Sequence, residues 1–154
     1  MKIGIFDSGV GGLVVTQSLI AALPEYDYVY LGDTARVPYG NRSQEKIYEF
    51  TLEALEFLFK KECELVIIAC NTASAEALRK IQQEYLPVAF PERKVLGVLI
   101  PAAEEAARQT KNKKIGVLAT ASTVHSETFV KEGTKACAGH GGVSGGCTPT
   151  RSFD

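Results

Sequence analysis

The sequence predicts a three-layer α/β protein, in which a mostly parallel sheet of about five strands is covered by helices on both faces. Short apolar segments alternate along the chain with segments of helical spacing, and this alternation is typical of parallel sheets. The apolar segments IGIF, LVIIA and IGVLA are continuous, as expected of strands that are buried on both sides. The length of 154 residues is enough for one domain with a hydrophobic core.

Each predicted strand is a short apolar run that ends at a polar segment or at the start of a helix. In chain order, the runs are Lys2–Phe6, Tyr28–Leu31, Leu65–Ala69, Val95–Leu99 and Lys114–Leu118. The carboxyl ends of parallel strands meet at one edge of a sheet, and open α/β sheets bind their ligands there. The segments that follow these strands are therefore the first place to look for a functional site.

The segments between the strands have the spacing and the end signals of helices. Ser43 is a candidate N-cap, and Pro101 fits the first turn of a helix. The predicted helices are Leu13–Leu23, Gln44–Lys61 with Ile47, Phe50, Leu55 and Leu58 on one face, Thr72–Tyr85, a helix after the fourth strand, and one that begins near Ser122. From Gly133 onward the chain is rich in Gly, Ser and Thr without apolar periodicity. We therefore predict one α/β domain over residues 1–132 and a flexible or non-native tail over residues 133–154.

Composition and charge exclude several classes of function. The chain has 17 Lys and Arg against 18 Asp and Glu, a net charge of −1, so we expect no binding to nucleic acid or to an anionic membrane. The amino terminus has no apolar stretch of signal-peptide length, and the run Leu65–Cys70 is far shorter than the roughly 20 residues that span a bilayer. We therefore expect a cytoplasmic protein. Among four cysteines and two histidines there is no CxxC pair, so we predict no metal site.

Cys70 is the cysteine best placed to react. It stands between the predicted strand 65–69 and the predicted helix 72–85, and a helix N-terminus stabilises a thiolate. Asn71 and Thr72 add hydrogen-bond donors beside it. The alternative is that Cys70 is only a small buried apolar side chain, which is a common role of cysteine.

Asp7 and Ser8 begin the segment DSGVGG, which follows the first strand. Its glycines allow a sharp turn and present N–H groups to an anion, but the spacing is not that of the dinucleotide-binding motif. The Asp7 carboxylate would repel a phosphate and would suit the ammonium group of a substrate. The alternative is that Asp7 only caps the following helix.

Two later segments also follow strand ends. Gly32–Gly40 is longer than a tight connection and fits either a binding loop or a polar surface loop with a Pro-Tyr-Gly turn. Thr120–Ser126 offers hydroxyl groups at a helix start, which helix capping alone would explain. We expect His125 to be a solvated helix residue.

Together, these segments resemble the glutamate racemase family. The matching stretches are IGIFDSGVGGL, YLGDTARVPYG, IIACNTASAEAL and IGVLATASTVHS, in the order of the family. The resemblance implies one domain of a two-domain racemase fold. It also implies an isomerase that interconverts L- and D-glutamate without cofactor or metal, and whose D-glutamate enters peptidoglycan. Glutamate is chosen over aspartate by the resemblance alone.

The resemblance also implies a role for each matching residue. Cys70 would exchange the α-proton of glutamate on one face, and a carbanion-like transition state of this kind needs hydrogen bonds to the substrate carboxylate. Asp7 would take part in catalysis and, with Ser8, would bind the amino-acid head. The remaining candidates, which would hold the carboxylates, are Tyr39, Gly40, Asn71, Thr72 and Thr123.

The family has a second half that supplies an opposing cysteine in a Gly-Cys-Thr-His motif, and this chain is too short to contain it. Gly146-Cys147-Thr148 is followed by Pro149, so we do not expect Cys147, or Cys137, to be the counterpart. Three interpretations follow: a truncated racemase with little racemisation, a homodimer that places two Cys70 thiols around one substrate, or a non-catalytic module that keeps a glutamate-like pocket. The face left by the missing half would be apolar and would favour dimers.

Overall fold

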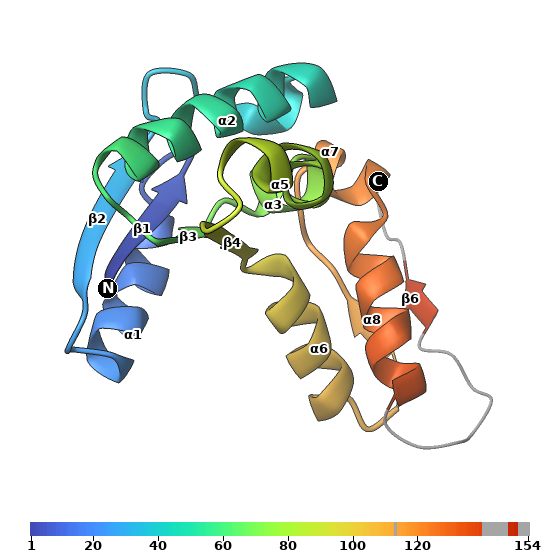
Figure 1. The fold of residues 1–154 in the computed structure, drawn as a ribbon. Helices are drawn as coiled ribbons and strands as arrows, with labels where there is room; N and C mark the ends of the chain where they lie inside the picture. The colour runs from blue at the N-terminus through green and yellow to red at the C-terminus, as the bar shows by residue number, and fades with distance from the viewer. Residues whose placement is uncertain (113, 140–147, 151–154) are drawn as a thin grey trace.

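A four-stranded parallel sheet forms the centre of the molecule. The computed structural model describes residues 1–112, 114–139 and 148–150 (Figure 1). The sheet contains β1 (Lys2–Asp7), β2 (Asp27–Gly32), β3 (Leu65–Ile68) and β4 (Lys94–Gly97), in the spatial order β2-β1-β3-β4. All three pairings are parallel, with Phe6 opposite Leu31 on one side and opposite Ile68 on the other. The predicted fold class is confirmed.

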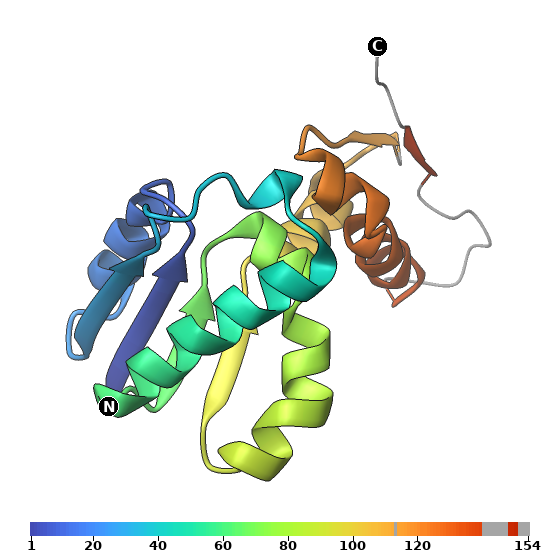
Figure 2. The same cartoon turned by 90° about the horizontal axis from the view of Figure 1, so that it is seen from above.

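Helices cover both faces of this sheet, as predicted. On one face, α1 (Gly12–Ala22) packs through Val15 and Leu19 on Ile3 and Ile5 of β1. On the other face lie α2 (Gln44–Lys60) and a helical run of four segments (Figures 1 and 2). The four segments are α3 (Asn71–Glu76), α4 (Leu78–Lys80), the π-helical turn η2 (Ile81–Tyr85) and α5 (Leu86–Ala89).

The start of α2 follows the predicted capping pattern. The Ser43 hydroxyl accepts a hydrogen bond from the backbone N–H of Lys46 at 3.4 Å, which satisfies one of the free donors at the helix start. Ile47, Leu55 and Leu58 are fully buried on the face that contacts the sheet, so the sequence identified this face correctly.

The fifth predicted strand does not join the central sheet, and this corrects the prediction of one sheet of about five strands. β5 (Lys114–Gly116) pairs in parallel with β6 (Thr148–Thr150) in a separate sheet (Figures 1 and 2). The reason is the path of α6 (Leu99–Gln109), which leads away from β4 and packs beside α8 (Thr128–Gly139). The apolar run ends at Leu118, which is 98% exposed.

The segment after β5 forms two helices. α7 (Ala121–His125) packs against α3 and against the short helix η1 (Tyr39–Asn41), and α8 follows it. The predicted boundary between residues 132 and 133 falls within α8, so the division into a domain and a tail stays a prediction. The side chain of Cys137 and the whole of Cys147 lie outside the described residues. Within the described ranges, no helix is long and apolar enough to cross a membrane.

The packing of α2 gives a direct test of the fold. Leu55 is fully buried, so Leu55→Ala should lower the free energy of unfolding by about 2–5 kcal/mol. Leu13 is 49% exposed on α1, and the matched variant Leu13→Ala should change the free energy of unfolding by less than about 1 kcal/mol. Urea unfolding followed by circular dichroism measures both values. Equal losses in the two variants would contradict the burial of α2 on the sheet.

Candidate active site

Cys70 lies where the strand β3 meets the helix α3. It is the N-cap of α3 and has extended backbone angles, so its side chain turns back toward the first turn of the helix. The sulfur accepts a hydrogen bond from the backbone N–H of Ala73 at 3.4 Å and lies 3.2 Å from the Ser8 hydroxyl oxygen. The residue is 5% exposed and belongs to the core cluster that contains Phe6 and Tyr39. The thiol is thus buried, yet two polar groups contact it.

Asp7 and Ser8 point to opposite faces of the sheet because successive side chains alternate along an extended chain. The Asp7 carboxylate is buried toward α1, where it accepts hydrogen bonds from the Gly12 N–H at 2.8 Å and the Tyr30 hydroxyl at 3.4 Å. Burial raises the pKa of Tyr30 to about 12, with the Asp7 carboxylate as the second cause. Asp7 therefore binds the first N–H of α1, although the N-cap position itself is Gly11, and Ser8 is the residue that reaches Cys70.

Gly12 is required for this arrangement. A Cβ atom at that position would lie 2.8 Å from the Asp7 Cβ and 2.9 Å from the Ala69 Cβ, so only glycine lets α1 approach the strand ends this closely. The segment DSGVGG thereby places the helix start against the carboxyl ends of β1 and β3.

The loop from Asp33 to Gly40 is fixed by a buried tyrosine. The Tyr39 hydroxyl donates a hydrogen bond to Asp33 Oδ2 at 2.6 Å, and Arg36 Nε donates to the same oxygen at 2.6 Å. Arg36 also pairs with Glu53 of α2 at 2.5 Å and lies over the Phe50 ring, 4.2 Å from its centre. Burial, and then the hydrogen bond to Asp33, raise the pKa of Tyr39. The loop is thus anchored by the buried Tyr39, while Thr34, Ala35, Val37 and Pro38 are exposed, so both interpretations of the segment stay open.

Three threonine hydroxyls form a chain beside the Cys70 helix start. The Thr72 and Thr120 oxygens are 3.1 Å apart, and the Thr120 and Thr123 oxygens are 3.0 Å apart. Gly40 joins this group, because a Cβ there would lie 2.9 Å from the Thr120 Cβ. The sequence pointed to Thr72 and Thr123 but not to Thr120, which connects them. Its position at a helix start after a strand is the signal that could have identified it. Helix capping was a sufficient explanation for a threonine there, and Thr120 does cap α7 by accepting from the Thr123 N–H.

The structure thus brings most of the predicted residues to one edge of the sheet. Ser8 contacts Cys70, and Thr72 is linked to Thr123 through Thr120. The Asn71 side chain is exposed, and His125 is an exposed residue of α7 whose Nδ1 lies 2.8 Å from the Ala121 carbonyl oxygen. In the part of the chain that the structure describes, no three His, Cys, Asp or Glu side chains are grouped as a metal site would require.

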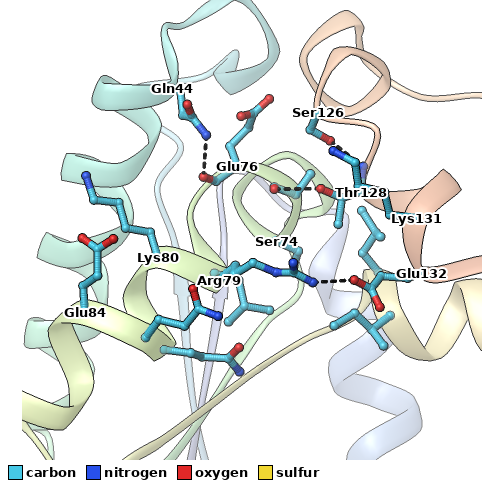
Figure 3. A pocket seen from close by; sticks show the side chains of 16 residues that line it. Gln44, Ser74, Glu76, Arg79, Lys80, Glu84, Ser126, Thr128, Lys131 and Glu132 are labelled. Atoms are coloured by element: carbon cyan, nitrogen blue, oxygen red, sulfur yellow. Dashed lines mark hydrogen bonds and ion pairs between the residues drawn. The ribbon is translucent and has the colours of Figure 1, made fainter. Parts of the chain in front are cut away.

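The molecule also contains a cavity of about 650 Å³ away from these residues, between the helical run that begins at α3 and the helices α6 and α8. Figure 3 shows Arg79 reaching across it to Glu132, and the two groups are 2.6 Å apart. The lining contains both acidic and basic side chains. It includes Ser74, whose N–H donates to the Cys70 carbonyl, but not Cys70, Ser8 or the three threonines. The thiol and its hydrogen-bond donors converge at the strand ends, which are therefore the candidate site.

The sequence matches the family described as Asp/Glu/Hydantoin racemase over residues 3–151. The chain belongs to this family.

Similar proteins narrow the comparison to one kind of racemase. The glutamate racemase of Aquifex aeolicus (strain VF5) is 49% identical over 129 residues, which are 84% of this chain and 48% of that protein. The structure of glutamate racemase from Aquifex pyrophilus has a TM-score of 0.81 at 45% identity and shares 88% of this chain and 52% of its own. The structure from Francisella tularensis subsp. tularensis SCHU S4, in complex with D-glutamate, has a TM-score of 0.73 at 37% identity over 88% of this chain and 48% of that one. These similarities confirm the resemblance that the motifs suggested.

The chain spans about half the length of the relatives it matches. All residues of the candidate site lie at the carboxyl ends of the strands of the central sheet or in the segments that pack beside them. Cys70, Ser8, the threonine chain and the Tyr39 loop all belong to this site.

The Tyr39 loop gives a test by pH. A tyrosine whose pKa is raised on folding stays neutral while the tyrosine of the unfolded chain ionises near pH 10. The unfolded state then binds fewer protons, so stability falls as the pH rises above about 10. At pH 8, Tyr39→Phe should have a free energy of unfolding about 1–2 kcal/mol below wild type, because the hydrogen bond to Asp33 is lost. Between pH 9 and pH 11, the stability of the variant should fall less than that of wild type.

Urea unfolding at several pH values measures this difference. The other tyrosines with raised pKa values, Tyr28, Tyr30 and Tyr85, are unchanged in the variant and contribute equally to both proteins. Parallel pH curves for wild type and Tyr39→Phe would show that folding does not raise the pKa of Tyr39.

Proposed function

We propose that this chain contains the amino-terminal catalytic half of a glutamate racemase, a cofactor-independent isomerase that interconverts L- and D-glutamate. The observation that carries the proposal is the Cys70 sulfur, which lies at the carboxyl edge of the sheet within reach of the Ser8 hydroxyl and the Ala73 amide. Membership of the racemase family and the identity to glutamate racemases support glutamate as the substrate. A relative's structure is described as a complex with D-glutamate, which is consistent with this choice.

In the proposed reaction, the Cys70 thiolate removes the α-proton of glutamate. The C–H bond breaks, the S–H bond forms, and the electron pair stays on the carbon, where the adjacent carboxylate delocalises it. Burial of the thiol keeps water away and strengthens the hydrogen bonds that stabilise the developing charge. The reverse transfer from the Cys70 thiol returns a proton to the same face of the substrate.

The surrounding groups supply the contacts that glutamate needs. The hydroxyls of Thr72 and Thr123 lie on one connected chain beside the first turn of α3, where a carboxylate would find several donors. The backbone at Tyr39 and Gly40 lies next to the threonine hydroxyls and is held by the hydrogen bond from Tyr39 to Asp33. Asn71 is exposed at the start of α3. We assign these residues to the substrate carboxylates.

We assign Asp7 and Ser8 to the amino-acid head. The carboxylate of Asp7 supplies negative charge at the strand ends for the substrate ammonium group, and its hydrogen bonds to Gly12 and Tyr30 fix its position. A direct catalytic role of Asp7 stays a prediction. Its Oδ2 atom accepts from the Gly12 N–H of α1, whereas Ser8 is the residue that contacts the sulfur.

Inversion of the α-carbon needs an acid on the face opposite to the base. Whether such an acid is present decides between exchange with retention and racemisation. Relatives about twice as long would supply it from the rest of their chain. With Cys70 alone, the protein would exchange the α-proton with retention of configuration. If two copies associate about a two-fold axis, each would provide one thiol, and a homodimer would racemise glutamate.

A non-catalytic role is the alternative from a different class. The same contacts would bind glutamate without proton transfer, so the chain would be a binding module. For the catalytic form, we propose a cytoplasmic enzyme whose D-glutamate is used in peptidoglycan, and hence in cell-wall synthesis and cell shape.

Exchange of the α-proton in heavy water separates these functions. Purified protein is incubated with L-glutamate, and α-deuterium uptake is followed by NMR while the enantiomers are separated by chiral chromatography. We expect uptake with retained L-configuration, and Cys70→Ser should abolish it. Cys63 is a second buried cysteine, away from the strand ends, and Cys63→Ala is the matched control that should keep the exchange.

The protein concentration distinguishes the dimer from the single chain. Formation of D-glutamate at a rate per chain that rises with protein concentration would support the homodimer, whereas concentration-independent exchange supports one-sided chemistry. No exchange by folded protein would leave the binding module, and exchange that persists in Cys70→Ser would show that another residue is the base.

A further inference from the structure

The environment of the Cys70 sulfur contains one hydroxyl group that the proposed mechanism uses only for substrate binding. Among the described residues, the groups within hydrogen-bonding distance of Sγ are the Ser8 hydroxyl at 3.2 Å and the Ala73 backbone N–H at 3.4 Å. The amide is a fixed part of the helix start. Ser8 is therefore the adjustable partner of the thiol.

The register of the sheet explains why Ser8 has this position. Phe6 lies opposite Ile68, and the Ala69 N–H donates a hydrogen bond to the Phe6 carbonyl at 2.7 Å. Ser8 and Cys70 each follow this pair by two residues, so their side chains emerge on the same face of the sheet. Asp7 is one residue out of phase with Ser8, and its carboxylate faces α1 instead.

The charged and titratable groups of the neighbouring elements are already bound to other partners. Asp7 at the end of β1 accepts from Gly12 and Tyr30. On the other side, Tyr39 of η1 donates its proton to Asp33, so it does not serve as an acid for the sulfur. The described contacts to the sulfur therefore come from uncharged groups, and the Ser8 hydroxyl is the only side chain among them.

We propose that Ser8 is a positioning residue for Cys70, whose hydroxyl donates a hydrogen bond to the thiolate and stabilises it over the thiol. The proposal rests on the proposed role of Cys70 as the proton-transfer group. Hydrogen bonds to a charged acceptor are stronger than those to a neutral one, so the contact favours the thiolate before proton transfer. When the sulfur takes the α-proton it becomes a weak acceptor, and the hydroxyl is free to turn toward the substrate.

The protonation of Cys70 tests this proposal without substrate. The protein is labelled with ¹³C at the cysteine β-carbons, the Cys70 signal is assigned by comparison with Cys70→Ser, and its chemical shift is followed against pH. Ser8→Ala removes the donor and should move the midpoint of the Cys70 titration up by about one pH unit. Ser8→Thr keeps a hydroxyl and should bring the midpoint back toward wild type.

Ser18→Ala is the matched control. The Ser18 hydroxyl donates to the Val14 carbonyl on the exposed side of α1, so its removal should leave the midpoint unchanged. A midpoint in Ser8→Ala that is unchanged or lower than in wild type would overturn the proposal, and a lower one would show that the thiol is the donor. If Ser8→Ala does not give a folded spectrum, Ser8→Gly tests the same loss of the hydroxyl.

The exchange reaction provides the second readout. In Ser8→Ala, exchange of the α-proton should be about tenfold slower than in wild type below the midpoint and should recover at higher pH, because only the thiolate fraction has changed. An equal loss at every pH would indicate a role in substrate binding alone and would contradict the positioning role. If the proposed function fails instead, wild type shows no exchange while the Cys70 titration still responds to Ser8→Ala.

Discussion

The parallel pairing of β1 with β3 is the constraint on which the site depends. It places Phe6 opposite Ile68, and the two strands end together at the carboxyl edge of the sheet. Ser8 and Cys70 come together because each lies two residues beyond this pair. A shift of the register by one residue would turn one of these side chains to the other face and separate the hydroxyl from the sulfur. The same edge receives Tyr39 and the threonine chain, so the arrangement of every proposed contact follows from the strand ends.

The second consequence of this pairing is the division of labour between Asp7 and Ser8. Neighbouring residues in an extended chain face opposite sides, so one of them stabilises α1 and the other contacts the thiol. Gly12 completes the first contact, because α1 approaches so closely that a side chain would collide with Asp7 and Ala69. The glycine-rich segment therefore lets α1 pack closely against the strand ends.

Much of this arrangement was predictable from the sequence. The apolar runs identified the central strands, and Ser43 marked the start of α2, because these signals are local. The partner of β5 was not predictable, since its apolar residues would suit either sheet and its pairing depends on the direction of α6. The linking role of Thr120 was also hidden, because it depends on which side chain faces it across the fold. Local pattern thus gives the elements, and tertiary register decides the contacts.

The central claim is that small polar ligands bind at the strand ends around Cys70 and not in the cavity beside Arg79 and Glu132. Titration of ¹⁵N-labelled protein with L-glutamate, followed by backbone amide chemical shifts, tests this claim most directly. We predict that the changes concentrate at Ser8, Gly40 and Thr72. Changes confined to the residues that line the cavity would contradict it.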